Sequence, residues 1–204
     1  MVEAATEDEG LKTELFRQLD ATLVREDAVL ASNTSSIPIM KLGKATQRPE
    51  QVVGMHFFNP VPVLPLVEVV PSLFTSPATV QRVEVVAQDE LGKTVIRAQN
   101  RAGFIVNALL VPYLLSAVRV LESGYAYASA ADVDAGMVRG CAHPMGPLQL
   151  SDLISLDTVV AIANSMYEEF KEPLYSPPPM LLRMVEGGLL GRKTGRGFYE
   201  YDRH

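Results

Sequence analysis

Two side chains that can form an acid–base pair, His56 and Glu68, lie twelve residues apart. His56 is near the end of an apolar segment that predicts a buried strand, and Glu68 interrupts the apolar run 66–70. A buried carboxylate is costly without a partner. If the two strands are neighbours, about 4.8 Å apart, these side chains can meet. A carboxylate beside an imidazole orients the ring and stabilises its protonated form, so the pair is suited to act as a general base with its orienting group.

A structural hydrogen bond between His56 and Glu68 would explain the same pattern. The pair flanks the loop 59–65, which three prolines stiffen. Ligands of α/β proteins bind at the ends of strands, where this loop is expected. On the residues alone, both interpretations stay open.

Further polar residues occur where apolar ones are expected. Five small polar residues, Ser32 to Ser36, follow the apolar run 28–31. They can cap the next helix, or they can present hydroxyl and amide groups to a ligand in the same crevice. Asn107 lies inside the apolar run 103–110, and a buried amide needs a hydrogen-bond partner. That partner is either another group of the protein, in a purely structural hydrogen bond, or the substrate.

The elements that must position these side chains fall into two parts. Periodicity and turn residues predict helices and strands over the first hundred residues: helices at 6–23 and 77–91, and strands at 28–31, 52–58, 66–70 and 94–96. After residue 101 only helices are predicted: 104–122, one opened by Ser129 and Asp132, a helical pattern from 147 to 170, and 180–187. The predicted fold class is α/β followed by all-α, with domains at 1–101 and 102–204.

The predicted sheet lacks a partner for its N-terminal strand. A helix precedes the four predicted strands, and the first of these strands has no evident parallel partner. The chain contains no G-x-G-x-x-G motif after a strand, and the glycines at 187–188 and 195–197 lack the required strand before and helix after them. We therefore expect the α/β domain to lack its N-terminal part.

Composition excludes several classes of partner. The net charge of −6, with scattered Lys and Arg, argues against a nucleic-acid surface. The single cysteine, Cys141, cannot form an intrachain disulfide, which favours a reducing compartment. The acidic segment 1–9 is unlike a secretory signal, and the apolar run 104–118 is shorter than the roughly 20 residues that span a bilayer. We expect a cytoplasmic protein without a nucleic-acid, membrane or metal partner.

Several motifs in this chain resemble those of the 3-hydroxyacyl-CoA dehydrogenases in order and spacing. They are Ser32-Asn33-Thr34-Ser35-Ser36, His56-Phe57-Phe58-Asn59-Pro60, Leu66-Val67-Glu68-Val69, Gly103-Phe104-Ile105-Val106-Asn107, Tyr113-Leu114, His143-Pro144-Met145-Gly146-Pro147 and Gly191-Arg192-Lys193-Thr194-Gly195-Arg196-Gly197-Phe198-Tyr199. The resemblance covers essentially the whole chain. It extends to the single-function, short-chain type, which includes 3-hydroxybutyryl-CoA dehydrogenases.

The resemblance implies a role for each candidate residue. His56 takes the proton from the 3-hydroxyl group, Glu68 holds its imidazole, and hydride passes from C3 to NAD. Ser35 and Asn107 hydrogen-bond the substrate's oxygens. The cofactor-side residues that it implies are Glu7, Lys12, Ser35, Asn59 and Lys193. Without the resemblance, Glu7 and Lys12 would be interpreted as an exposed pair of charges on a helix.

The implied function is NAD-dependent oxidation of a short-chain (3S)-3-hydroxyacyl-CoA to the 3-oxoacyl-CoA, in fatty acid or butanoate metabolism. The fold it implies is a partial Rossmann-like domain followed by a helical domain that forms a homodimer. The apolar residues at 104–118 and at Leu148, Leu150, Leu153, Ile154 and Leu156 exceed what this domain is expected to cover alone. The alternative is a truncated, inactive paralogue that binds acyl-CoA or dimerises, because the family's Gly-rich turn would precede residue 1 and the NAD cradle would be incomplete.

Overall fold

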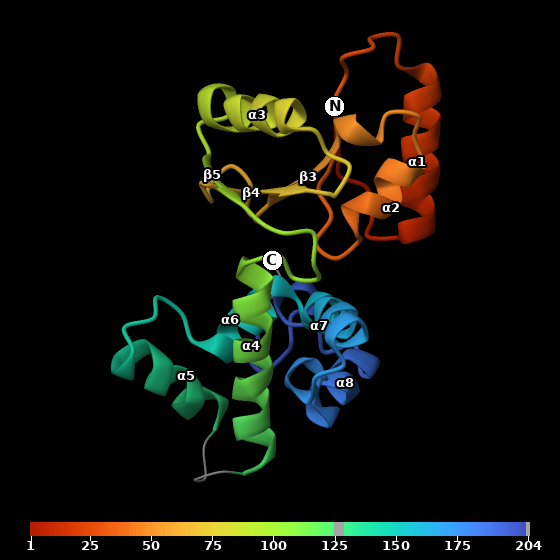
Figure 1. Cartoon of the computed structure of the whole chain (residues 1–204). Helices are drawn as coiled ribbons and strands as arrows, with labels where there is room; N and C mark the ends of the chain where they lie inside the picture. Colours follow the sequence, from red (N-terminus) through yellow and green to blue (C-terminus); the bar gives the residue numbers. More distant parts are fainter. Residues whose placement is uncertain (125–128, 203–204) are drawn as a thin grey trace. The chain divides into compact units, whose positions relative to one another are not determined.

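A computed structural model of the protein describes residues 1–124 and 129–202, which form two compact units, Met1–Ile105 and Val106–His204 (Figure 1). The sequence places the domain boundary between residues 101 and 102. The first unit is an α/β layer and the second is built from helices. The predicted fold class, α/β followed by all-α, is confirmed.

A five-stranded sheet in the order β1-β2-β3-β4-β5 forms the centre of the first unit. Its strands are β1 (Val2–Glu3), β2 (Leu30–Ser32), β3 (Val52–Phe57), β4 (Leu66–Pro71) and β5 (Thr94–Arg97). The first three are parallel, β4 is antiparallel to β3, and β5 is parallel to β4. The carboxyl ends of β1, β2 and β3 therefore share one edge of the sheet.

The predicted sheet of four strands is wrong at its N-terminus. Val2 and Glu3 pair in parallel with Ala31 and Ser32, so the strand at 30–32 has a parallel partner on each side. Two residues are too few to show the alternation by which a strand is recognised, and these two stand beside acidic residues that favour a loop. The second strand also begins two residues later than the predicted 28–31.

Alternation along β3 assigns its side chains to two cores, one on each face of the sheet. Val52 packs on one face with Phe16 of α1 (Glu9–Thr22) and Ile39 of α2 (Ile39–Lys44). Val53 packs on the other face with Val83 of α3 (Pro77–Val85). Figure 1 shows α3 on one side of the strands and α1 and α2 on the other.

The helices of the first unit begin at side-chain caps. Asp8 accepts the backbone N–H of Leu11 at 2.7 Å and opens α1. Ser76 caps α3, with Pro77 at the first helical position, where the predicted helix 77–91 begins. The predicted helix 77–91 continues past α3 as a π-helical turn over Val86–Glu90.

The second unit contains five α-helices in its described residues: α4 (Val106–Glu122), α5 (Ala130–Gly140), α6 (Pro147–Ile154), α7 (Leu156–Phe170) and α8 (Pro179–Glu186). Ser129 and Asp132 form the predicted capping box of α5. The helical pattern from 147 to 170 is interrupted at Ser155, whose φ of 88° ends α6 and begins α7. No helix of the described residues is both long and apolar enough to span a bilayer.

A buried carboxylate, Asp152, organises the C-terminal segment of this unit. It accepts the backbone N–H groups of Phe198 and Tyr199 and the hydroxyl of Tyr201, each at 3.0 Å. Burial and this hydrogen bond raise the pKa of Tyr201 to about 12, so its hydroxyl keeps the proton it donates at neutral pH. A Cβ atom at residue 197 would lie 2.0 Å from the Asp152 carboxylate, which explains the glycine there.

Replacing Gly197 by Ala is predicted to destabilise the protein, because the added methyl group overlaps the Asp152 carboxylate. Overpacking of this kind costs about 1–3 kcal/mol in the free energy of unfolding. Gly136 in α5 is a matched control, since nothing lies within 4 Å of a Cβ atom there. Gly136→Ala should stabilise by up to ~1 kcal/mol through helix propensity. Urea unfolding measures both variants, and equal midpoints would contradict the prediction.

Candidate active site

His56 and Glu68 are directly opposite each other in the antiparallel pair of β3 and β4. The imidazole Nδ1 lies 2.7 Å from the Glu68 Oε2 atom. Both side chains are buried, with Glu68 fully inaccessible to solvent. The predicted contact between these two strands and these two side chains is therefore confirmed. Because the pair is buried and its hydrogen bond is short, the carboxylate fixes the orientation of the ring.

Glu68 also holds the end of the first unit. Its Oε1 atom accepts the backbone N–H of Ile105 at 3.0 Å. The preceding residues, Gly103 and Phe104, have φ values of 82° and 47°, so the chain turns sharply before this bond. The centroid of the Phe104 ring lies 5.4 Å from that of the His56 imidazole, and the centroid of the Phe58 ring lies 4.6 Å from it. Both rings meet the imidazole in an edge-to-face arrangement. These two rings restrict the imidazole further, although neither is among the site residues predicted from the sequence.

The other ring nitrogen of His56 faces Ser35. The Ser35 Oγ atom lies 3.2 Å from Nε2. Ser35 follows β2, whose carboxyl end shares an edge of the sheet with that of the parallel strand β3, and this topology brings the two residues together. A neutral imidazole that donates from Nδ1 to Glu68 has an unprotonated Nε2. That nitrogen accepts the Ser35 hydroxyl here and is suited to accept the proton of a substrate hydroxyl.

Glu7 fixes the loop that carries Ser35. One carboxylate oxygen, Oε1, accepts the Thr34 hydroxyl at 2.6 Å and the backbone N–H groups of Ser35 and Ser36 at 2.9 and 3.0 Å. Thr34 in turn accepts the N–H of Ile37 at 2.9 Å. The loop after β2 thus serves as a local hydrogen-bonded turn and also presents Ser35 to His56.

Lys12 is fully buried, so its interpretation as half of an exposed charge pair is wrong. Its ammonium group lies 2.8 Å from Glu3 and 3.7 Å from Glu7. Burial by itself would raise the pKa of Glu3, but hydrogen bonds from Lys12, Ser32 and the Ala5 backbone bring it below its ordinary value. This interaction therefore stabilises the fold above the ordinary pKa of 4.5, and the contribution is lost as the pH falls through the lowered value.

Two asparagines stand near the end of β3. Asn33, which the sequence analysis treated only as part of a polar run, accepts the backbone N–H of Phe57 at 2.9 Å and ties the two loops together. Asn59 is exposed in the loop that follows β3. Its predicted place on the cofactor side stays a prediction.

The remaining candidates, Asn107 and Lys193, belong to the second unit. Asn107 is buried in the first turn of α4. Lys193 is exposed and forms an ion pair with Asp157 at 2.9 Å. The structure thus brings five candidates together within the first unit: His56, Glu68, Ser35, Glu7 and Lys12. The described residues contain no group of three His, Cys, Asp or Glu side chains placed to hold a metal ion.

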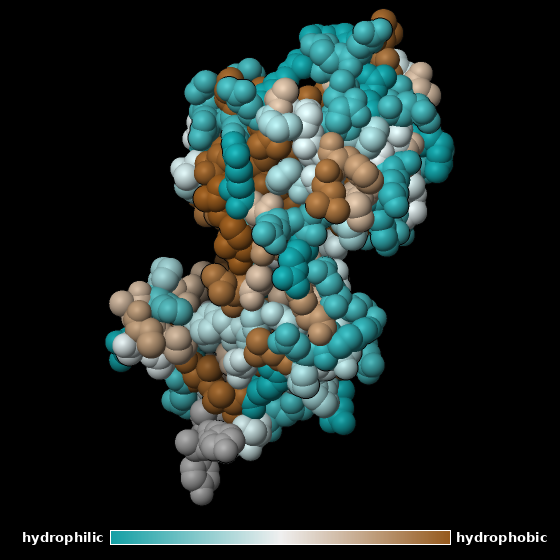
Figure 2. Space-filling view, viewed as in Figure 1, coloured by the Kyte–Doolittle hydropathy of each residue, from teal (hydrophilic) through white to brown (hydrophobic). Residues whose placement is uncertain are grey.

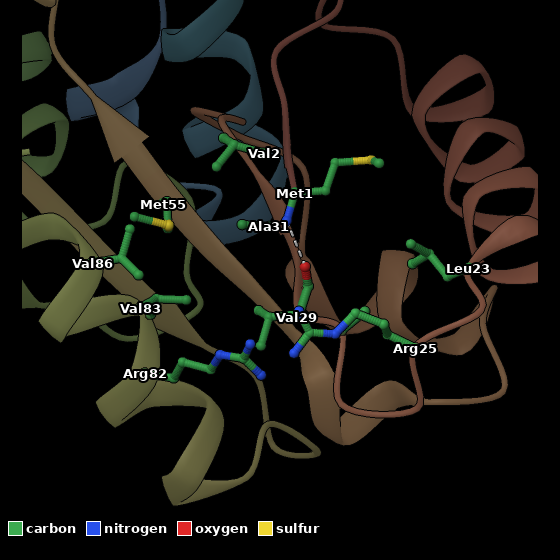
Figure 3. Close-up of a pocket in the computed structure, with 11 residues that line it drawn as sticks. Met1, Val2, Leu23, Arg25, Val29, Ala31, Met55, Arg82, Val83 and Val86 are labelled. Carbon is green, nitrogen blue, oxygen red and sulfur yellow. Dashed lines mark hydrogen bonds between the residues drawn. The ribbon is translucent and has the colours of Figure 1, made fainter. Parts of the chain in front are cut away.

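A pocket of about 320 Å³ lies elsewhere in the first unit (Figure 3). Ala31 and Met55 line it from the strands, Val29 from just before β2, and Arg82 and Val83 from α3. Met55 precedes His56 in β3, and successive side chains of a strand point to opposite faces. The pocket is therefore on the face of the sheet away from His56, and it contains none of the predicted site residues.

Comparison with known proteins matches both parts of the chain. The family profile described as "3-hydroxyacyl-CoA dehydrogenase, NAD binding domain" matches residues 1–101, and the profile of the C-terminal domain matches residues 103–201. The chain belongs to the 3-hydroxyacyl-CoA dehydrogenase family. These are NAD-dependent oxidoreductases, so the predicted enzyme class, cofactor and Rossmann-like fold are confirmed.

Similar members of the family include several bacterial proteins. A protein named 3-hydroxybutyryl-CoA dehydrogenase from Mycobacterium tuberculosis (strain ATCC 25618 / H37Rv) is 60% identical over 201 residues, which cover 98% of this chain and 70% of that protein. The crystal structure of M. tuberculosis FadB2 gives a TM-score of 0.96 with the same identity and coverage. The (S)-3-hydroxybutyryl-CoA dehydrogenase PaaH1 from Ralstonia eutropha is 47% identical with a TM-score of 0.93, over 99% of this chain and 70% of that one.

The expectation that the NAD-binding domain lacks its N-terminal part is not borne out. The family profile of that domain matches from residue 1, and the sheet begins with β1 before the first helix. The alternative of an inactive, dimerising paralogue also gains no support, because similar proteins aligned over nearly the whole chain are named as dehydrogenases.

Proposed function

We propose that the chain catalyses NAD-dependent oxidation of a short-chain (3S)-3-hydroxyacyl-CoA to the corresponding 3-oxoacyl-CoA. One observation carries this proposal: the buried His56 imidazole is held at Nδ1 by Glu68 and faces the Ser35 hydroxyl at Nε2. The short acyl chain is supported by relatives at 60% and 43% identity that are named 3-hydroxybutyryl-CoA dehydrogenase. In this proposal residues 1–101 bind NAD and catalyse, and residues 102–204 dimerise.

His56 acts as the general base in this mechanism. Its Nε2 atom takes the proton of the substrate's 3-hydroxyl group as the C3–H bond breaks. The positive charge that forms on the imidazole is stabilised by the Glu68 carboxylate, 2.7 Å from Nδ1. Glu68 also keeps Nε2 directed at Ser35 throughout the reaction. Acid–base catalysis by a positioned group is worth about 10²–10⁴ in rate.

Ser35 and Asn107 serve the substrate's oxygens. The Ser35 hydroxyl is already within 3.2 Å of the base, so it lies where the 3-hydroxyl group must bind. Asn107, a buried amide in the first turn of α4, supplies a second donor. Donors that are fixed before the reaction stabilise the charge that develops on a carbonyl oxygen.

The first unit also offers side chains that fit NAD. The Glu7 side chain is partly exposed, and Glu7 stands with Lys12 at the carboxyl ends of parallel strands, where nucleotides bind in α/β folds. The Glu7 carboxylate would accept hydrogen bonds from ribose hydroxyls, with Ser35, Asn59 and Lys193 as further contacts of the cofactor. NAD bound there would supply the acceptor for the hydride of C3.

Replacing His56 by Gln is predicted to lower kcat for acetoacetyl-CoA reduction by roughly 10²–10⁴, because the proton donor of the reverse reaction is lost. Glu68→Gln should lower kcat by a smaller factor, since the base remains but loses its orienting charge. His143→Gln is the control, because His143 contacts Tyr113 in the second unit. NADH consumption measures all three. Wild-type rates in both His56→Gln and Glu68→Gln would show that the pair is only structural.

We further propose that the helical unit forms a homodimer. The predicted contribution of Leu148 and Leu156 to the dimer surface is wrong, because both side chains are already buried in the single chain. Other apolar side chains of that unit are exposed, including Leu109 at 73% and Leu153 at 46%. Figure 2 shows apolar surface among the polar side chains of the helical unit. A second copy would cover these side chains, which is the usual arrangement for such surfaces.

Sedimentation of the chain at low micromolar concentration is predicted to show a dimer. Leu109→Glu should shift it toward monomer, because a carboxylate would then be buried in the interface. The matched control is Val24→Glu, since Val24 is 95% exposed in a turn of the first unit. A compact, stable wild-type monomer would refute the dimer.

A further inference from the structure

A buried ion pair under the proposed cofactor side is not explained by the roles assigned so far. Glu3, the last residue of β1, directs its carboxylate to the Lys12 ammonium group, with N–O distances of 2.8 and 3.0 Å. Lys12 is fully inaccessible and Glu3 is 8% exposed. Burying two charges is costly, so a pair that persists in such a place needs compensating bonds.

Those compensating bonds are all present. The Ser32 hydroxyl donates to the second oxygen of Glu3 at 2.6 Å, and the Ala5 backbone N–H donates to the first. The Lys12 ammonium group donates also to the Ala5 carbonyl at 3.1 Å. β1, β2 and α1 thus converge on this pair, and Lys12 cannot leave it without exposing a buried carboxylate.

From this pair the contacts continue to the catalytic base. Lys12 faces Glu7 at 3.7 Å, Glu7 fixes the backbone of Ser35 at 2.9 Å, and the Ser35 hydroxyl lies 3.2 Å from His56. The Glu7 carboxylate lies between the Lys12 ammonium group and the N–H groups of the loop. The position of the Glu7 carboxylate therefore depends on the position of the Lys12 ammonium group, which the Glu3 carboxylate holds.

We propose that Glu3 is a positioning residue: its buried carboxylate holds Lys12, which holds Glu7 at the cofactor and at the loop that presents Ser35 to His56. The inference rests on the proposed function for the NAD contact of Glu7, which Lys12 holds from below the surface. Its structural part, that Glu3 retains Lys12, is independent of activity.

The first test is the accessibility of Lys12 to amine acetylation, mapped by peptide mass spectrometry. In the wild type Lys12 should be protected, whereas Lys41, with a side chain 54% exposed, should react. Glu3→Gln should raise acetylation of Lys12 about tenfold or more, because a hydrogen bond between charged groups is lost. Glu9→Gln is the control: Glu9 pairs with the exposed Lys41, so this variant should leave Lys12 protected. Continued protection of Lys12 in Glu3→Gln would overturn the proposal.

The second test separates positioning from a merely structural role. Glu3→Gln should raise the KM for NADH about tenfold, by the same lost charge-assisted bond, and should raise the KM for acetoacetyl-CoA by a smaller factor through the loop that presents Ser35. Ser32→Ala removes one donor to Glu3 and is the second variant if Glu3→Gln does not fold. It should raise both the acetylation of Lys12 and the KM for NADH, each by a smaller factor than Glu3→Gln. Equal KM values for NADH in wild type and Glu3→Gln would overturn the proposal. An inactive wild type would count against the proposed function, and the acetylation result would still decide whether Glu3 holds Lys12.

Discussion

The hydrogen bond between His56 Nδ1 and Glu68 is the interaction on which the rest of the site depends. It exists because β3 and β4 pair in one register, which places residues 56 and 68 opposite each other on one face of the sheet. A shift of one residue would turn one of these side chains to the opposite face. The same carboxylate holds Ile105, so the geometry of the base and the end of the first unit are fixed together.

Around this bond, the sheet brings together groups that are far apart in the chain. Parallel pairing of β1, β2 and β3 places Glu3, the loop with Ser35, and His56 at one edge. Polar contacts link them, from the buried Lys12 through the partly exposed Glu7 to Ser35. Low exposure strengthens the two buried pairs, Glu3 with Lys12 and His56 with Glu68, and makes an unpaired group in either of them costly.

Much of this arrangement was predictable because it rests on local patterns. A Glu in an apolar strand needs a partner, and His56 was the available one. Ser129 and Asp132 marked the start of α5, because their side chains can cap the free N–H groups of a helix. Other features depend on tertiary contacts that no local pattern records. The two-residue β1 is formed only by pairing with β2, Lys12 is buried only because Glu3 faces it, and Ser155 breaks a continuous helical pattern with a φ of 88°.

The proposed mechanism requires Glu68 to hold His56 with Nε2 free to take a proton. Long-range ¹⁵N–¹H NMR of the labelled chain reads which ring nitrogen of the neutral imidazole carries hydrogen, and His56→Gln identifies the signal among the three histidines. We predict a proton on Nδ1 and none on Nε2, with this preference weakened in Glu68→Gln. A neutral His56 protonated on Nε2 in the wild type would contradict this mechanism, because that nitrogen could not then accept the substrate's proton.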